Sequence, residues 1–175
     1  MAQGYTRERL FEIFQRIDVD RSGSISANEL QRALSNGTWE PFNIMTVQAM
    51  IGMYSNPSYS SEIDFEGFVK LWKFVENWQN YFQAVDLDRS GCIDLNELQS
   101  AISKAGYRLS PAMYRLMMGR FDRKKKGVIY FDDFVHMCII LQKLTDQFRQ
   151  ADQDRDGYIQ IGFEEFLSRV FTAFT

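Results

Sequence analysis

The sequence has 175 residues, of which 45% are hydrophobic and 25% are charged, a composition typical of a folded protein with a sizeable core. Its formal net charge of −3 gives no general attraction for nucleic acid or for an anionic membrane surface. Two cysteines, Cys92 and Cys138, are too few for a disulfide scaffold, and no apolar run resembles a signal peptide or a membrane span. We therefore expect a protein of the cytosol or nucleus.

One phrase of alternating oxygen-bearing residues recurs along the chain. Clear copies are IDVDRSGSISANEL from Ile17, VDLDRSGCIDLNEL from Val85, FDRKKKGVIYFDDF from Phe121 and ADQDRDGYIQIGFEEF from Ala151. A weaker copy, SNPSYSSEIDFEGF from Ser55, comes second in chain order. Each copy is flanked by apolar residues at helical spacing, which is the helix–loop–helix pattern of an EF-hand.

The segments between the loops indicate how the units pair. Residues 68–85 and 134–151 contain neither proline nor glycine, so each is predicted to form one continuous helix between two loops. Glycine and proline interrupt the other two segments, at Gly37, Pro41, Gly106 and Pro111. Helices can fold back at these breaks, so loop one should pair with loop two and loop three with loop four. Loop five is left unpaired.

The predicted fold is therefore all-α, with short paired β-strands between the loops and an unpaired fifth hand. We expect a single domain over residues 1–175. Its five units are predicted at residues 8–36, 43–73, 73–105, 111–140 and 140–175.

Two of the five loops carry a full set of calcium ligands, since calcium prefers six to eight oxygens with a bidentate carboxylate at the twelfth position. Loop one supplies Asp18, Asp20, Ser22, the carbonyl of Ser24, and Glu29. Loop three supplies Asp86, Asp88, Ser90, the carbonyl of Cys92, and Glu97. Ion-free turns are the alternative, but they would require two chance matches with helices in register.

Loop five has only the front half of such a site. Its predicted ligands are Asp152, Asp154, Asp156 and the carbonyl of Tyr158. Phe163 occupies the closing position, and Glu165 would replace it only if the loop were stretched by two residues. We expect a weaker site that could take magnesium, with an ion-free turn as the alternative.

The remaining loops are predicted to be structural. Lys124 and Lys126 stand at ligand positions of loop four, where cations repel a divalent ion. Loop two contains Pro57 and has Gly67 at the closing position. Both hands complete a pair without holding metal.

The unpaired fifth hand would expose apolar residues near the C-terminus. These are Phe163, Phe166, Val170 and Phe171. A two-fold dimer through the fifth hands would cover them, either with a second copy or with a paralogue. The alternative is that this segment packs on its own chain.

Several phrases resemble the penta-EF-hand family, and within it the branch of ALG-2 and peflin. They are SNGTWEPFN from Ser35, WQNYF from Trp78, GYRLS from Gly106, FDDF from Phe131 and LTDQFRQAD from Leu144. The resemblance implies that calcium at the first and third hands exposes a groove for proline-rich segments of partner proteins. It assigns Arg108 to the opening of the groove, Trp72, Trp78 and Tyr107 to its wall, and Trp39 to a second apolar pocket.

Catalysis is not expected, because His136 is the only histidine and no nucleophile or phosphate-binding motif is present. The function predicted is a calcium-dependent sensor and adaptor. A passive calcium buffer and a regulatory subunit of a partner enzyme are the alternatives. Association with membranes is expected to be calcium-dependent at most, and nucleic acid is not an expected partner.

Overall fold

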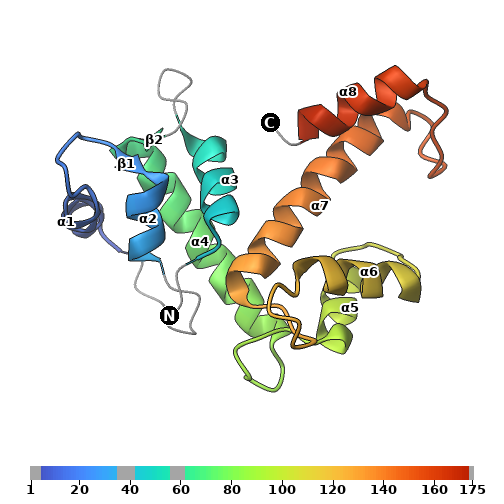
Figure 1. Cartoon of the computed structure of the whole chain (residues 1–175), viewed down its shortest axis with the longest axis horizontal. Helices are drawn as coiled ribbons and strands as arrows, with labels where there is room; N and C mark the ends of the chain where they lie inside the picture. Colours follow the sequence, from blue (N-terminus) through green and yellow to red (C-terminus); the bar gives the residue numbers. More distant parts are fainter. Residues whose placement is uncertain (1–4, 35–41, 56–61, 174–175) are drawn as a thin grey trace. The chain divides into compact units, whose positions relative to one another are not determined.

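The computed structural model describes residues 5–34, 42–55 and 62–173 (Figure 1). Its elements are α1 (Arg7–Ile17), β1 (Ile25–Ser26), α2 (Ala27–Ala33), α3 (Ile44–Tyr54), β2 (Glu62–Ile63), α4 (Phe65–Val85), α5 (Leu95–Lys104), α6 (Pro111–Phe121), α7 (Phe131–Ala151) and α8 (Phe163–Ala173). The prediction of a helical fold with short strands is confirmed. No helix among the described residues is long and apolar enough to cross a membrane.

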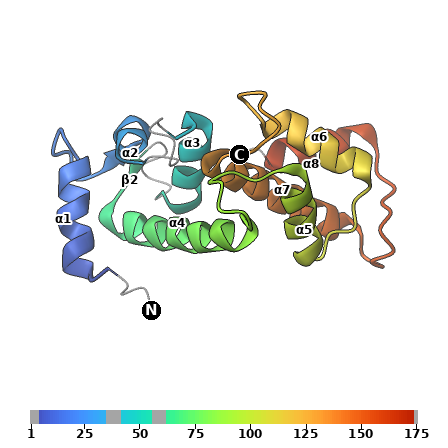
Figure 2. The same ribbon diagram turned by 90° about the horizontal axis from the view of Figure 1, so that it is seen from below.

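The chain divides into two compact units, residues 1–135 and residues 136–175. In the first unit, α1 and α3 both pack against the long helix α4, and α2 packs against α3 (Figure 2). The predicted continuous helices are confirmed as α4 and α7. The predicted break after loop three is also confirmed, since Ser110 caps α6 and Pro111 is its first residue.

Pairs of β-branched residues join the loops two by two. Ile25 pairs with Ile63 in an antiparallel two-stranded sheet, and Ile93 pairs with Ile129 in an isolated antiparallel bridge. All four side chains are fully buried. The predicted pairing of loops one with two and three with four is therefore confirmed. Among the described residues, no strand or bridge involves loop five.

An aromatic cluster forms the centre of the first unit. The ring of Phe82 on α4 lies 5.3 Å from that of Phe131 and 5.5 Å from that of Phe134, both at the start of α7. Phe42, which precedes α3, contacts Phe131 at 5.7 Å. Edge-to-face pairs of this kind add to the stability gained from burial alone. The cluster fixes the C-terminal half of α4, where loop three begins.

Candidate metal sites

Four loops share one backbone conformation. The fourth residue of each has a positive φ between 52° and 59°, and the sixth is a glycine with φ between 76° and 87°. The residues are Arg21 and Gly23, Arg89 and Gly91, Lys125 and Gly127, and Arg155 and Gly157. Glycine adopts this conformation without strain, which explains its place at the sharp turn.

In loop one, the first aspartate organises the turn. Asp18 accepts hydrogen bonds from the backbone N–H groups of Ser22 and Gly23, both at 2.9 Å. Asp20 accepts a second bond from the N–H of Ser22 at 3.0 Å. The hydroxyl of Ser22 donates to the carbonyl of Ser24 at 3.1 Å. These hydrogen bonds tie four of the predicted ligands, Asp18, Asp20, Ser22 and the carbonyl of Ser24, to one another or to the same turn.

Loop three repeats this arrangement closely. Asp86 accepts from the N–H groups of Ser90 and Gly91 at 2.9 Å, and Asp88 accepts from the N–H of Ser90 at 2.9 Å. The hydroxyl of Ser90 donates to the carbonyl of Cys92 at 3.1 Å. Two loops far apart in the sequence therefore present the same oxygen atoms in the same way.

The closing glutamates are held at the third position of the exit helices. Glu29 accepts hydrogen bonds from the backbone N–H of Val19 and of Ser26, both at 2.9 Å. Glu97 does the same with Leu87 at 2.8 Å and Asp94 at 3.0 Å. Ser26 and Asp94 cap α2 and α5 in return, which forms a capping box at each helix start. In each loop the glutamate predicted to bind the metal ion also takes part in starting the following helix.

The carboxylates of each loop converge. One oxygen from each of Asp18, Asp20 and Glu29 lies within 4.8 Å of the others, and the same holds for Asp86, Asp88 and Glu97. Like charges at this distance repel one another unless a cation lies between them. An all-oxygen donor set with three carboxylates is the chemistry that calcium prefers. The residues of both loops therefore fit a calcium ion.

Local hydrogen bonds favour the charged form of these groups. The pKa of Asp20 is lowered by hydrogen bonds from the side chain and then the backbone of Ser22, and that of Asp88 is lowered by Ser90 in the same way. Partial burial would raise the pKa of Glu29. Hydrogen bonds from Ser26 and from the N–H of Val19 outweigh that effect and lower it. The loops are thus ready to bind a cation at neutral pH.

Loop five keeps three converging aspartates without a closing glutamate. Asp152, Asp154 and Asp156 each offer an oxygen within 4.8 Å of the others. Oδ1 of Asp152 is buried and has no hydrogen-bond partner among the described residues, which suits a cation ligand. Tyr158, whose carbonyl is the fourth predicted ligand, donates its backbone N–H to Asp156 at 2.7 Å.

The exit helix of loop five starts late. Helices α2 and α5 begin nine residues after Asp18 and Asp86, whereas α8 begins at Phe163, eleven residues after Asp152. Glu165 is therefore the third residue of its helix, as Glu29 and Glu97 are of theirs. Its carboxylate accepts two hydrogen bonds from Arg169, at 2.7 and 3.1 Å. The loop is stretched by two residues, and its glutamate pairs with an arginine on the same helix.

The second hand leaves no room for a ligand at its closing position. Residues 56–61 of loop two lie outside the described part of the chain. A Cβ atom added to Gly67 would lie 2.6 Å from the carbonyl oxygen of Tyr54 and 2.6 Å from Cγ1 of Ile63. No side chain fits there without movement of the backbone.

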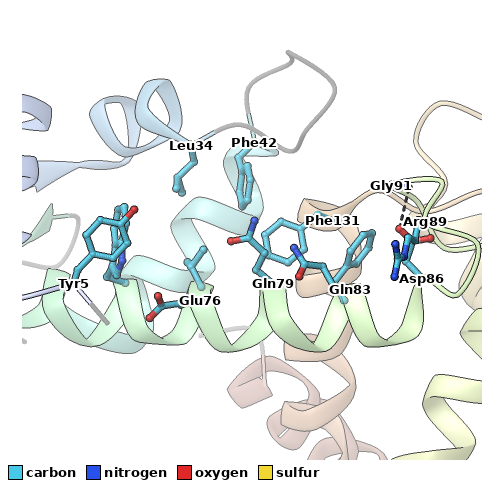
Figure 3. A pocket seen from close by; sticks show the side chains of 13 residues that line it. Tyr5, Leu34, Phe42, Glu76, Gln79, Gln83, Asp86, Arg89, Gly91 and Phe131 are labelled. Carbon is cyan, nitrogen blue, oxygen red and sulfur yellow. Dashed lines mark hydrogen bonds between the residues drawn. The ribbon is translucent and has the colours of Figure 1, made fainter. Parts of the chain in front are cut away.

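A cavity of about 490 Å³ lies along α4 in the first unit (Figure 3). One face of α4 forms its floor, and loop three closes one end with Asp86, Arg89 and Gly91. Its lining is Tyr5, Leu34, Phe42, Trp72, Val75, Glu76, Gln79, Phe82, Gln83, Asp86, Arg89, Gly91 and Phe131. Tyr5 and Trp72 meet edge to face at 5.2 Å. The sequence reasoning did not identify Tyr5 or Arg89 as pocket residues.

The structure separates the residues predicted for an aromatic groove. Of the predicted residues that the structure describes, only Trp72 lines the cavity, and Trp78 instead contacts Phe74 at 6.0 Å and Phe134 at 6.1 Å. Tyr107 is half-buried and Arg108 exposed, both between α5 and α6. Trp39 lies outside the described residues.

Known protein families match most of the chain. The model of the EF-hand domain pair matches residues 7–73 and 75–139, and an EF-hand model matches residues 144–168. With the three acidic clusters, this match defines the class as calcium-binding EF-hand proteins.

Individual relatives narrow the class. Sorcin from Schistosoma japonicum is 48% identical over 162 residues, which cover 93% of this chain and 94% of that protein. Peflin from Homo sapiens is 43% identical over 156 residues, covering 89% of this chain but only 55% of peflin. A solved structure, a homolog of programmed cell death 6 protein from Leishmania major Friedlin, has a TM-score of 0.81 at 31% identity and covers 97% of this chain and 95% of its own. The chain belongs to the penta-EF-hand family, and the resemblance found in the sequence is confirmed.

Proposed function

We propose that this calcium-binding protein is a sensor and adaptor, in which calcium at the first and third hands controls a surface for proline-rich segments of partner proteins. The observation that carries the proposal is that loop three forms one end of the cavity along α4. Asp86 is both a predicted calcium ligand and part of the cavity wall. A buffer would not need this overlap of metal loop and binding surface.

The link between ion and cavity passes through the end of α4. The backbone N–H of Asp86 donates to the carbonyl of Phe82 at 2.8 Å and so caps the helix. Phe82 itself lines the cavity and is one turn away from the metal ligand. Bound calcium supplies the positive charge that the carboxylates of loop three share. When Asp86 and Glu97 shift to share it, the end of α4 and the start of α5 have to follow.

The cavity lining suits an extended proline-rich segment. Trp72, Tyr5 and Phe42 provide aromatic surface, and Gln79 and Gln83 provide amide donors for the unpaired backbone carbonyls of such a segment. Proline-rich segments are already extended, so they lose little conformational entropy on binding. Trp78, Tyr107 and Arg108 do not line this cavity, and they remain proposed partner contacts outside it because of the family resemblance, as Trp39 does for a second pocket.

We further propose that the fifth hand joins two chains, either two copies or this chain and a paralogue. Phe163 is 76% exposed and Phe171 is 66% exposed on α8. Phe166 and Val170 line an apolar cavity of about 210 Å³ in the second unit. Exposed apolar surface of this kind is typical of a protein interface. Analytical ultracentrifugation should give a dimer for the wild type and a monomer for Phe163→Ser with Phe171→Ser. A monomeric wild type at micromolar concentration would contradict a homodimer.

We propose that the chain has no catalytic activity of its own and acts in the cytosol or nucleus. Burial raises the pKa of the Cys138 thiol to about 12, so this thiol is not a ready nucleophile.

A calcium titration tests the sensor proposal. Tryptophan fluorescence and the binding of an apolar dye are followed together, on the wild type and on Glu97→Ala. A calcium-dependent rise of dye binding that Glu97→Ala abolishes supports a sensor, and a proline-rich peptide should then compete with the dye. Calcium binding without any change in either signal would instead indicate a buffer.

A further inference from the structure

Loop four has the backbone of a cation-binding loop although it lacks the usual ligands. Asp122 accepts hydrogen bonds from the backbone N–H of Lys126 at 3.0 Å and of Gly127 at 2.6 Å, as the first aspartate does in loops one and three. Lys125 and Gly127 have the positive φ angles of the turn. Ile129 forms the bridge to loop three. The loop therefore has the turn and the strand pairing of a metal-binding loop, and the question is what positive charge it holds in place of a metal ion.

The second residue of the loop supplies a cation. Nε of Arg123 lies 2.7 Å from both carboxylate oxygens of Asp133, and Nη2 lies 2.6 Å from Oδ2 of Asp132. Asp133 is the twelfth residue of the loop, the position that Glu29 and Glu97 occupy in loops one and three. The guanidinium therefore contacts the carboxylate that would close the loop around a metal ion.

The two aspartates need this positive charge. Asp132 is fully buried and Asp133 is only 3% exposed. Two neighbouring carboxylates that are both buried would repel one another and lose their hydration, unless a cation and hydrogen-bond donors compensate. Arg123 supplies a positive charge to both carboxylates, and its side chain is 43% exposed at the rim of the site.

The remaining donors come from the second hand. The backbone N–H of Asn43 donates to Oδ2 of Asp132 at 2.8 Å, and its side-chain amide donates to Oδ1 of Asp133 at 3.0 Å. The hydroxyl of Thr46 donates to the backbone carbonyl of Asp132 at 3.2 Å. The first turn of α7 is thus bonded to the first turn of α3, which is the entry helix of hand two.

We propose that Arg123 is the built-in cation of the fourth hand. Its guanidinium takes the place of a metal ion at the closing carboxylate, so the hand stays closed at every calcium concentration. Through Asp132 and Asp133, this fixed charge also anchors the start of α3. Hands two and four thereby form a calcium-independent frame within which hands one and three bind and release calcium. The inference rests on this contact set and not on the proposed adaptor function.

Thermal unfolding of the full chain in excess chelator tests the anchoring. Arg123→Ala should lower the Tm by roughly 10 °C, because it removes the guanidinium that is bonded to two buried carboxylates. Arg123→Lys keeps the charge but loses the planar fork, so its Tm should lie in between. Arg115→Ala, an exposed arginine on α6, is the control and should change the Tm little. A Tm for Arg123→Ala within about 2 °C of that control would overturn the proposal.

The number of calcium ions bound per chain, measured by isothermal titration calorimetry, tests whether Arg123 takes the place of a metal ion in loop four. Lys124→Asp with Lys126→Asp places carboxylates at the third and fifth positions of loop four. With Arg123 still present, this double variant should gain no calcium ion, because the closing carboxylate is already occupied. Adding Arg123→Ala should bring the gain of one ion per chain. Equal gain with and without Arg123, or no gain in either variant, would overturn the proposal, whether or not the protein proves to be an adaptor.

Discussion

Loops three and four lie side by side in one pair, bridged by Ile93 and Ile129. Each begins with an aspartate that accepts two backbone hydrogen bonds, and each turns at a glycine of positive φ. The two loops differ in the groups that lie next to the carboxylate at the twelfth position. Glu97 converges with Asp86 and Asp88 on an open oxygen set, whereas Asp133 is bonded to Arg123. The conformation of an EF-hand loop and its capacity for metal are therefore set by separate residues.

Loop five shows the opposite combination to loop four. It keeps the converging aspartates that loop four lacks, but α8 starts two residues later than α2 and α5 do after their loops. Ligands at the front of a loop thus do not suffice, since the start of the exit helix decides whether a carboxylate closes the site.

The largest effect is expected at Glu97. Replacing Glu97 with Gln keeps the shape but removes the charged bidentate ligand, so the calcium affinity of hand three should fall on the order of 100-fold. The matched control is Glu165→Gln, at the same place in its own helix but bonded to Arg169. Calorimetry should show almost no change for that control. Equal losses at both positions would mean that hand five closes as hand three does.

The next effect concerns the second hand. Gly67→Ala should reduce the free energy of unfolding by about 1–3 kcal/mol, because its Cβ would collide with the backbone of Tyr54. The control is Gly52→Ala on α3, where nothing lies within 4 Å of an added Cβ. That variant should gain up to about 1 kcal/mol from helix propensity. Urea denaturation measures both, and equal stabilities would contradict the close packing at Gly67.

A smaller effect is expected in hand five. Arg169→Ala removes the partner of Glu165 and leaves this carboxylate available to the loop. Because a partly exposed ion pair is weak, the calcium affinity of hand five should rise no more than about fivefold. A fall in affinity, measured in a chain whose hands one and three are disabled, would show that Arg169 supports the loop instead of competing with it.

The smallest effect is expected in the reactivity of the two cysteines, and it is measured on the unmodified protein. Cys92 and Cys138 are both half-buried, but desolvation of the thiol raises the pKa of Cys138 to about 12. At pH 8 little of the Cys138 thiol is ionised, so a thiol reagent should label Cys138 more slowly than Cys92 in the native protein. Rapid labelling of both thiols in the folded protein would contradict the burial of Cys138.

Much of this arrangement could be predicted from local sequence. Glycine and proline positions predicted the pairing of loops. The spacing from Asp86 to Glu97 predicted a metal site, and the structure brings the carboxylates of these two residues together. Helical geometry could also have separated Trp72 from Trp78, because six residues at 3.6 per turn place them on different faces of α4. Arg123 was missed because EF-hand ligands are sought at alternate positions and not at the second. Asn43, which donates to the same carboxylate of Asp133 as Arg123 does, lies 90 residues before Asp133 in the sequence, a contact that only the folded chain shows.

Calorimetric titration of the Glu29→Gln, Glu97→Gln double variant tests the central claim most directly. The account predicts that both tight calcium sites of the wild type disappear and that only the weaker binding of loop five remains. A tight calcium ion that survives in the double variant would contradict the assignment of the sites to the first and third hands.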